Sequence, residues 1–374
     1  MAEIELHVIG GKEGESLVLK LPDGEWGVID CYTPSPADPA ANPTFALLQS
    51  KGVTRLRFLG LTHAHQDHYR GMAGLLERFE VQEFWMFGAL STRELWEQLA
   101  QLLQGQVESL AHPSPDDTAD VDEFVRLLDA IHSRAQKRAM RLMTYSLNTR
   151  LVENSNSGGA SVTAIGPSGR STSAYHESLD RCFEVKNSRL LLREKLPKAD
   201  QNKASGAFIV EFGTTRIVLG GDMETDGWID AVEYYGPQGR LASVVVKASH
   251  HGSTNGYSPN SWTHLSPERT ATAVVTAYVK SGLPRVEGLR HIAEHVSQTL
   301  VTSRSCVPSV LRAVNAPLTL TTDSADALLA LRAVFTALPS LEKSRCQGIC
   351  SFVFDDAGHF KVQCDGDAAV LVVT

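Results

Sequence analysis

The feature that most constrains the fold is the stretch "LGLTHAHQDHYRGMAG", residues 59–74, where three histidines and an aspartate follow an apolar run. The run predicts a buried strand that delivers ligands at its carboxyl end, as in layered α/β folds. His63 and His65 alternate along an extended segment and therefore face the same side, while Asp67 and His68 follow in a turn. Imidazoles suit zinc or similar metals and a carboxylate can hold a second ion, so the pattern predicts two adjacent metal sites.

Hydrophobic periodicity predicts strands and helices along the rest of the chain. Residues 4–31 ("IELHVIG", "ESLVLKLPDG" and "WGVIDCY") predict a three-stranded meander, and "GAFIVEFGTTRIVLGGDME" predicts a hairpin that ends in an acidic loop. Three later apolar runs are separated by helical segments, so strands alternate with helices in each half of the chain. We expect one α/β domain over residues 1–374, built as a four-layer αββα sandwich, because 374 residues with 43% hydrophobic content can bury such a core.

Residues 91–150 differ from their surroundings and predict a helical insertion within this domain. Ser91 and Glu94 have the spacing of a capping box, and "VDEFVRLLDAIHSRAQKRAMRLM" carries an apolar stripe at helical spacing. The insertion lies between the first histidine motif and the next strand, so we expect it to form a lid or wall over the metal cleft. A polar helix is also predicted over "AYHESLDRCFEVKNSRLLLREKL".

Four motifs in order resemble those of the metallo-β-lactamase superfamily. Besides "THAHQDH", they are Asp30 in "GVIDCY", Asp222 in "IVLGGDME", and the histidine pair in "VVVKASHHGS". The resemblance implies a metal-dependent hydrolase that uses a metal-activated water, with one or two zinc ions, or manganese. It implies that Asp30 supports the ligands and Asp222 bridges two metals, and that His250 is the ligand of the pair, with His251 as the alternative.

A narrower resemblance concerns the metallo-hydrolase domain of the competence DNA-uptake channel ComEC and its soluble relatives. It is carried by "GKEGESLVLKLPDG", residues 202–205 and "KASHHGS", and it implies phosphodiester chemistry. The alternative is that these segments are strands and turns that any superfamily member needs.

One departure from the superfamily pattern affects the expected ligand set. Many members have a further histidine at a strand end where this chain has "AIGPSG", with Pro167 at the ligand position. His112 and His176 are candidates by their order in the chain, but the first falls in the insertion and the second on a predicted helix. The site nearest His63 and His65 is therefore expected to lack one protein ligand and to hold its metal more weakly.

The resemblance also suggests roles in a reaction. Asp67 would orient the nucleophile, and His251 or Lys247 would meet the charge that develops on a phosphoryl or carbonyl oxygen. Lys247 has the alternative of facing solvent from mid-strand. Ser253 and Asn255, in the loop after the histidines, are candidate substrate contacts.

Charge and composition limit the kinds of substrate and partner that we expect. A net charge of -8 argues against non-specific nucleic-acid binding, so a small-molecule or nucleotide substrate is expected, with nucleic acid an open alternative that the charge does not indicate. The chain shows neither a secretion signal nor an apolar span of membrane length, and its six cysteines are expected to be reduced, which predicts a cytoplasmic protein. The alternative functions are hydrolysis of lactones, thioesters or sulfate esters, and a non-catalytic, metal-binding regulatory role.

Overall fold

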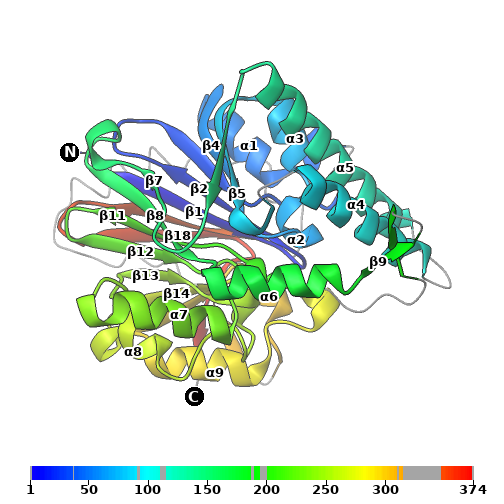
Figure 1. The fold of residues 1–374 in the computed structure, drawn as a ribbon. Coiled ribbons are helices and arrows are strands. Elements are labelled where there is room, and N and C mark those ends of the chain that lie inside the picture. Colours follow the sequence, from blue (N-terminus) through cyan, green and yellow to red (C-terminus); the bar gives the residue numbers. More distant parts are fainter. Residues whose placement is uncertain are drawn as a thin grey trace.

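The structure is a computed structural model that describes residues 2–36, 38–90, 93–109, 115–186, 189–193, 200–309, 311–314 and 347–372. Two β-sheets face each other, with helices α1, α3 and α5 outside one sheet and α7, α8 and α9 outside the other (Figure 1). This arrangement is the predicted αββα sandwich. The helices are α1 (Pro43–Ser50), α2 (Gln66–Tyr69), α3 (Met72–Arg78), α4 (Arg93–Glu108), α5 (Pro115–Gln136), α6 (Gly169–Asp180), α7 (Thr225–Tyr235), α8 (Ser261–Leu265) and α9 (Val286–His295).

The first sheet begins with the predicted meander, which is antiparallel from β1 to β3 and parallel from β3 to β6. Its strands, in spatial order, are β18 (Phe360–Gly366), β17 (Gly348–Phe354), β1 (Ile4–Gly10), β2 (Glu15–Lys20), β3 (Trp26–Ile29), β4 (Arg55–Leu61), β5 (Glu80–Phe87) and β6 (Arg141–Tyr145).

The second sheet contains the predicted hairpin, β11–β12, followed by the parallel strands β13, β14 and β15. Its spatial order is β16 (Arg312–Val314), β19 (Ala369–Val372), β15 (Gln298–Val301), β14 (Thr272–Val275), β13 (Val245–Lys247), β12 (Thr215–Leu219), β11 (Ala207–Phe212), β8 (Ala160–Gly166) and β7 (Arg150–Val152). The carboxyl ends of β3 and β4 in one sheet and of β12 and β13 in the other carry the polar motifs. The fold therefore brings these motifs together at one edge of the sandwich.

The hydrophobic core has two parts because strand side chains alternate between faces. In β11, Phe208 and Val210 belong to the cluster between the sheets, whereas Ala207 and Ile209 belong to the cluster beneath α7, α8 and α9. A strand that is buried on both faces reads as a continuous apolar run, as "AFIV" does.

The insertion is helical over a shorter range than predicted. Helices α4 and α5 account for it, but α5 ends at Gln136, and Arg141–Tyr145 pairs with β5 as strand β6. The helix predicted from residue 174 onward also ends early, at Asp180, and is followed by a hairpin of β9 (Phe183–Lys186) and β10 (Arg189–Leu192). In both places strand pairing overrides the helical pattern, with a distant strand in the case of β6 and within a local hairpin in the case of β9 and β10. Ser91 and His112 lie outside the described residues.

Within the part of the chain that the structure describes, no helix is long and apolar enough to cross a membrane.

Candidate metal centre

The first histidine motif is placed by the end of β4 and the short helix α2. Asp30, directly after β3, accepts hydrogen bonds through Oδ1 from the backbone N–H of Thr62 (2.8 Å) and through Oδ2 from its hydroxyl (2.7 Å). The same Oδ2 lies 2.7 Å from Nδ1 of His68. Asp30 therefore ties the end of β4 to α2 and fixes the orientation of the His68 ring, as the family resemblance implies.

Asp222 reaches the centre from the loop after β12. Gly221 precedes it with φ of +52°, and a Cβ there would collide with the carbonyl oxygen of Gly206, so only glycine fits. The backbone N–H of Asp222 donates to Oγ of Ser205, 2.9 Å away. This turn directs the carboxylate back across the end of the sheet toward the histidines.

The two histidines after β13 point in different directions because both have left-handed backbone conformations, with φ of 48° for His250 and 51° for His251. His251 is fully buried, and its Nε2 lies 2.9 Å from Oδ2 of Asp67. His250 is half-buried, with Nε2 3.1 Å from Nδ2 of Asn202 and Nδ1 3.5 Å from Oε1 of Glu224. The expected order of preference is therefore reversed: the tight turn aims the second histidine of the pair, not the first, at the metal ligands.

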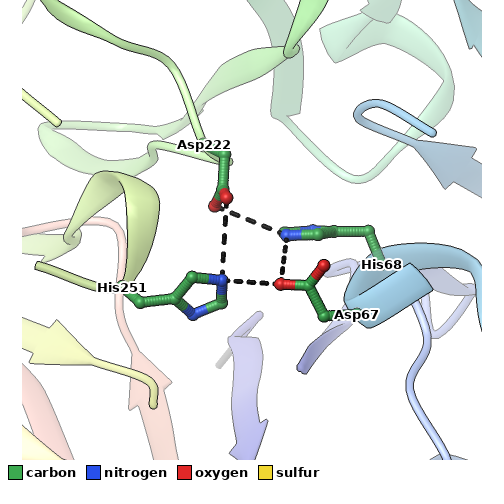
Figure 2. A group of neighbouring side chains, drawn as sticks. All are labelled: Asp67, His68, Asp222 and His251. Atoms are coloured by element: carbon green, nitrogen blue, oxygen red, sulfur yellow. Dashed lines mark hydrogen bonds and ion pairs between the residues drawn. The ribbon is translucent and has the colours of Figure 1, made fainter. Parts of the chain in front are cut away.

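Four buried side chains form a deep group: Asp67, His68, Asp222 and His251 (Figure 2). Their candidate ligand atoms all lie within 4.8 Å of one another. Nε2 of His68 is 3.4 Å from both Oδ2 of Asp67 and Oδ1 of Asp222, and Nε2 of His251 is 3.6 Å from Oδ2 of Asp222. Two carboxylates and two imidazoles thus converge on one point.

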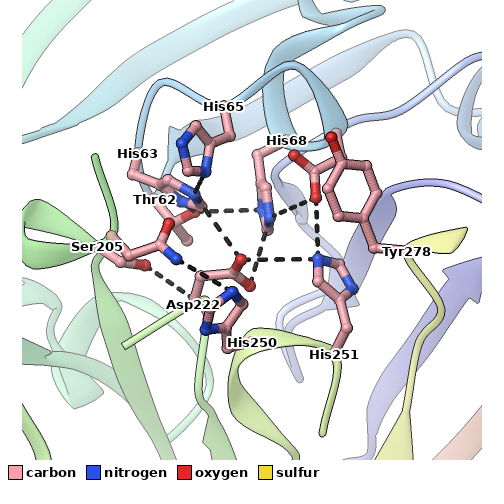
Figure 3. Close-up of polar contacts among 12 residues, drawn as sticks. Thr62, His63, His65, His68, Ser205, Asp222, His250, His251 and Tyr278 are labelled. Atoms are coloured by element: carbon pink, nitrogen blue, oxygen red, sulfur yellow. Dashed lines mark hydrogen bonds and ion pairs between the residues drawn. The ribbon is translucent and has the colours of Figure 1, made fainter. Parts of the chain in front are cut away.

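An outer group shares Asp222 and adds His63 and His65 (Figure 3). Nε2 of His63 lies 3.9 Å from Oδ2 of Asp222, and 3.0 Å from Nδ1 of His65. His63 is fully buried, whereas His65 is half-buried and faces the cavity. The two groups correspond to the two predicted sites, with His251 in the place expected for His250.

Burial and neighbouring charges set the protonation of these side chains. Burial alone raises the pKa of Asp67, but His68 and His251 outweigh it and hold this pKa well below its usual range. Burial lowers the pKa of His68, but Asp222, Asp67 and Asp30 raise it well above its usual range. For His63, burial and the adjacent His68 and His65 lower the pKa well below its usual range. The negative charges of Asp67 and Asp222 and a positive charge on His68 therefore stabilise one another.

The donor set fits a metal ion. Nε2 of His68 and Oδ1 of Asp222 are buried without a hydrogen-bond partner, although they lie only 3.4 Å apart. Leaving buried polar atoms unpaired costs roughly 1–3 kcal/mol each, so their convergence calls for a partner. Carboxylate oxygen and imidazole nitrogen are ligands for zinc and manganese, and a cation bound there would displace the proton of His68.

A buried ion pair supports the deep group from behind, and sequence reasoning missed it. Glu15, on β2, pairs with the Lys247 ammonium and accepts a hydrogen bond from the hydroxyl of Thr276, 2.6 Å away. Oγ1 of Thr276 in turn lies 3.0 Å from Nδ1 of His251. Lys247 is fully buried and does not line the cavity, so it neither faces solvent nor reaches a substrate, in contrast to both predictions for it.

A cavity of about 810 Å³ opens in front of the two groups. Its walls include Leu103 and Val107 of α4 and Val121 of α5, as expected for an insertion that walls the metal cleft. The polar residues that line it include His250 and Asn255, together with the cations Arg181 and Lys203. Ser253 is not among the lining residues; its hydroxyl donates to Oδ1 of Asn255, 2.6 Å away.

The position of the missing ligand is occupied by Pro167, which follows β8 after a cis peptide bond. His176 lies on α6 and belongs to none of the ligand groups formed by the described residues. Among those residues, His63 and His65 therefore share only Asp222 as a third candidate ligand.

The sequence matches no protein-family model and none of the curated proteins with which it was compared.

Some of the solved structures with a similar arrangement are described as hydrolases of the β-lactamase superfamily, at low identity. One is described as a metal-dependent hydrolase of the β-lactamase superfamily (TM-score 0.39, 11% identity, covering 80% of this chain and 94% of that one). Another is a metallo-β-lactamase motif mutant from Cronobacter sakazakii (TM-score 0.34, 14% identity, 78% and 90% coverage). A third, a β-hydroxylase mutant, gives a TM-score of 0.38 at 14% identity over 74% of this chain; the chain spans 46% of that protein, about half its length.

Two facing mixed sheets with helices outside form an αββα sandwich, and a buried His/Asp cluster lies at one edge of the sheets.

Proposed function

We propose that this protein is a metal-dependent hydrolase that cleaves phosphodiester bonds in nucleotides or nucleic acids. The observation that carries the proposal is the cavity, which combines the metal-ligand groups with two cations, Arg181 and Lys203. Within the described residues neither cation forms an ion pair with a carboxylate, so both are available to a substrate. A phosphodiester brings the negative charge that such cations bind, whereas a lactone or thioester group brings none.

The ligand groups fit one or two ions of zinc or manganese. His63, His65 and Asp222 would hold one, and Asp67, His68, Asp222 and His251 the other. Bound metal supplies Lewis acidity, which lowers the pKa of a water toward neutrality and stabilises negative charge on a phosphoryl group.

The chain itself supplies orientation and charge. Asp67 is ionised, because its pKa is held well below its usual range despite burial, and can accept a hydrogen bond from the attacking water. His250, which lines the cavity, would take the role expected for His251 or Lys247 and donate to the oxygen on which charge develops. Arg181 and Lys203 would hold the phosphate of the substrate, or a neighbouring one, against this arrangement.

The alternative functions differ in whether they would use the two cations of the cavity. Hydrolysis of a lactone or thioester would not use the two cations, a sulfate ester would use them, and a non-catalytic regulatory protein would bind metal without turnover. ComEC-like phosphodiester chemistry, implied by "KASHHGS", points to the same substrate class as the cations.

The test is a comparison of substrates under three metal conditions. Turnover of bis-nitrophenyl phosphate, an aryl sulfate, a lactone and a thioester is measured with zinc, with manganese and after metal removal. We expect the diester to be the best substrate and metal removal to abolish its hydrolysis. A faster lactone, thioester or sulfate reaction would replace the proposed substrate class, and metal binding without any turnover would favour the regulatory alternative.

Charge variants sharpen this test. Lys203→Gln and Arg181→Gln should each raise KM for the diester about 5- to 10-fold, because a hydrogen bond to a charged group contributes roughly 1.5–3 kcal/mol and solvent screens part of it. The matched control is Lys137→Gln, which removes an exposed cation that does not line the cavity. Equal KM values for all three variants would contradict the role of the cations.

A further inference from the structure

A second group of potential metal ligands lies on α9, and it shares no residue with the centre described above. His291, Glu294 and His295 come from the segment "HIAEH", and their ligand atoms all lie within 4.8 Å of one another. Residues three and four apart on a helix lie on the same face, so the local sequence alone brings the three side chains together. None of them lines the cavity of the metal centre.

The ring of His295 is oriented in the way typical of a metal ligand. Its Nδ1 lies 2.8 Å from the backbone carbonyl oxygen of His291, which can only accept a hydrogen bond. Nδ1 must therefore carry the proton, and Nε2 is left with a free lone pair. Histidine ligands commonly donate their second ring nitrogen to a carbonyl or carboxylate in the same manner.

His291 offers a second nitrogen of the same kind. Its Nε2 is buried and has no hydrogen-bond partner. The ring is held flat against Tyr257, with centroids 4.3 Å apart and an interplanar angle of 4°, and its centroid is 4.5 Å from that of His295. Burial and the neighbouring His295 lower the pKa of His291, which favours the neutral, ligating form.

Glu294 completes the group with a carboxylate on the solvent side. The side chain is exposed and forms no ion pair with any other described residue. We propose that His291, Glu294 and His295 form an additional binding site for a borderline transition metal, of which Zn²⁺ is the best-fitting example. Two imidazoles and one carboxylate supply three of the four positions of a tetrahedral zinc shell and leave the fourth to water or an external ligand.

The proposed site on α9 lies on a helix that packs against the turn carrying His251. Gly288 of α9 packs so closely on the carbonyl oxygen of Gly252 that no Cβ would fit, and Gly252 follows His251 directly. Tyr257, which stacks on His291, lies in the loop that also contains Asn255 of the cavity wall. A metal on α9 would therefore stiffen the side of the molecule from which the histidine turn and the cavity loop emerge.

The test counts metal ions on the full chain without a histidine tag. Zinc per chain is measured by mass spectrometry after dialysis against zinc-buffered solutions, for the wild type, His295→Ala and Glu294→Gln. The control is His359→Ala, which removes an exposed histidine that pairs with Asp355. We expect the wild type and the control to bind one zinc more than His295→Ala at a zinc concentration that saturates the wild type.

The affinity of that additional zinc should fall about 100-fold or more in His295→Ala, since loss of a partner outside the ligand shell already costs roughly 10- to 100-fold. Thermal unfolding in chelator shows whether each variant is folded. If His295→Ala were unfolded, Glu294→Gln would decide the matter, because this exposed side chain has no packing role and its loss should still weaken the additional zinc. Equal stoichiometry and affinity in the wild type, the control and a folded ligand variant would overturn the proposal.

Discussion

The two ligand groups of the metal centre share Asp222 but differ in what stands behind them. In the deep group, Asp30 and Thr276 hold the rings of His68 and His251, and all four candidate ligands are buried. In the outer group, His65 is half-buried and its ring nitrogen contacts only His63 within the described residues. Affinity for metal depends on the residues that orient the ligands as well as on the ligands themselves.

This difference suggests a division of labour within one centre. The deep group has four protein ligands fixed before any ion arrives, which is suited to retention. The outer group has three, which leaves positions open to water and substrate, as in catalytic rather than structural zinc sites.

The largest effect is expected from Asp67→Ala, which removes a deep ligand. Hydrolysis should fall by about 10²- to 10³-fold or more, because the proposed function gives this carboxylate two roles, as a metal ligand and as the group that orients the nucleophile. The fold should survive, since Asp67 lies in a short helix at the sheet edge and not in the core. Turnover and thermal unfolding are compared with Asp129→Ala, an exposed aspartate of α5; unchanged turnover with normal metal content would refute the mechanism.

The second prediction concerns the support behind the deep group. Glu15→Gln should destabilise the protein by about 3–5 kcal/mol, because it leaves the Lys247 ammonium buried without its countercharge. Urea unfolding of the single variants and of Glu15→Gln/Lys247→Met measures the coupling. The double variant should recover much of the loss; purely additive effects would show that the pair does not act as a unit.

The third prediction separates the two groups by chelation. Of the two ions in the metal centre, measured in the His295→Ala variant, one should leave at low chelator concentration and the other only at roughly 10- to 100-fold higher concentration, since the outer group has fewer protein ligands and weaker support. Added zinc or manganese should restore activity after the first step. His65→Ala should remove the weakly held ion alone, and simultaneous loss of two equally tight ions would contradict the division of labour.

The smallest effect is expected from Thr276→Val, which keeps the shape of the side chain but removes the hydroxyl between Glu15 and His251. The retained ion should be held about 10-fold more weakly, because His251 loses the group that orients its ring. The matched control is Thr299→Val, whose buried hydroxyl has no hydrogen-bond partner. Identical metal affinity in the two variants would show that this orientation is unimportant.

Sequence patterns predicted the sandwich and most of the centre because both depend on local signals. Apolar runs fixed the strands, and ligand motifs at strand ends placed His63, His65, Asp67, His68 and Asp222 together. The choice between His250 and His251 was missed because it depends on two left-handed residues in one turn, and neither is a glycine that would have marked the turn. Composition gives no warning of such backbone geometry.

Other features were missed because they depend on pairing between distant segments. Glu15 and Lys247 lie 232 residues apart, and an acid on one strand and a lysine on another predict no contact. Strands β17, β18 and β19 complete the two sheets from the end of the chain, where no motif signalled them.

The most direct test of the centre is an anomalous diffraction measurement on zinc-loaded crystals, before and after brief exposure to chelator. We expect two peaks at the sheet edge, one bound by Asp67, His68, Asp222 and His251, and one by His63, His65 and Asp222. After chelator, the second peak should weaken while the first persists. A peak bound by His250 in place of His251 would contradict the proposed ligand set, and the opposite order of loss would contradict tighter retention by the deep group.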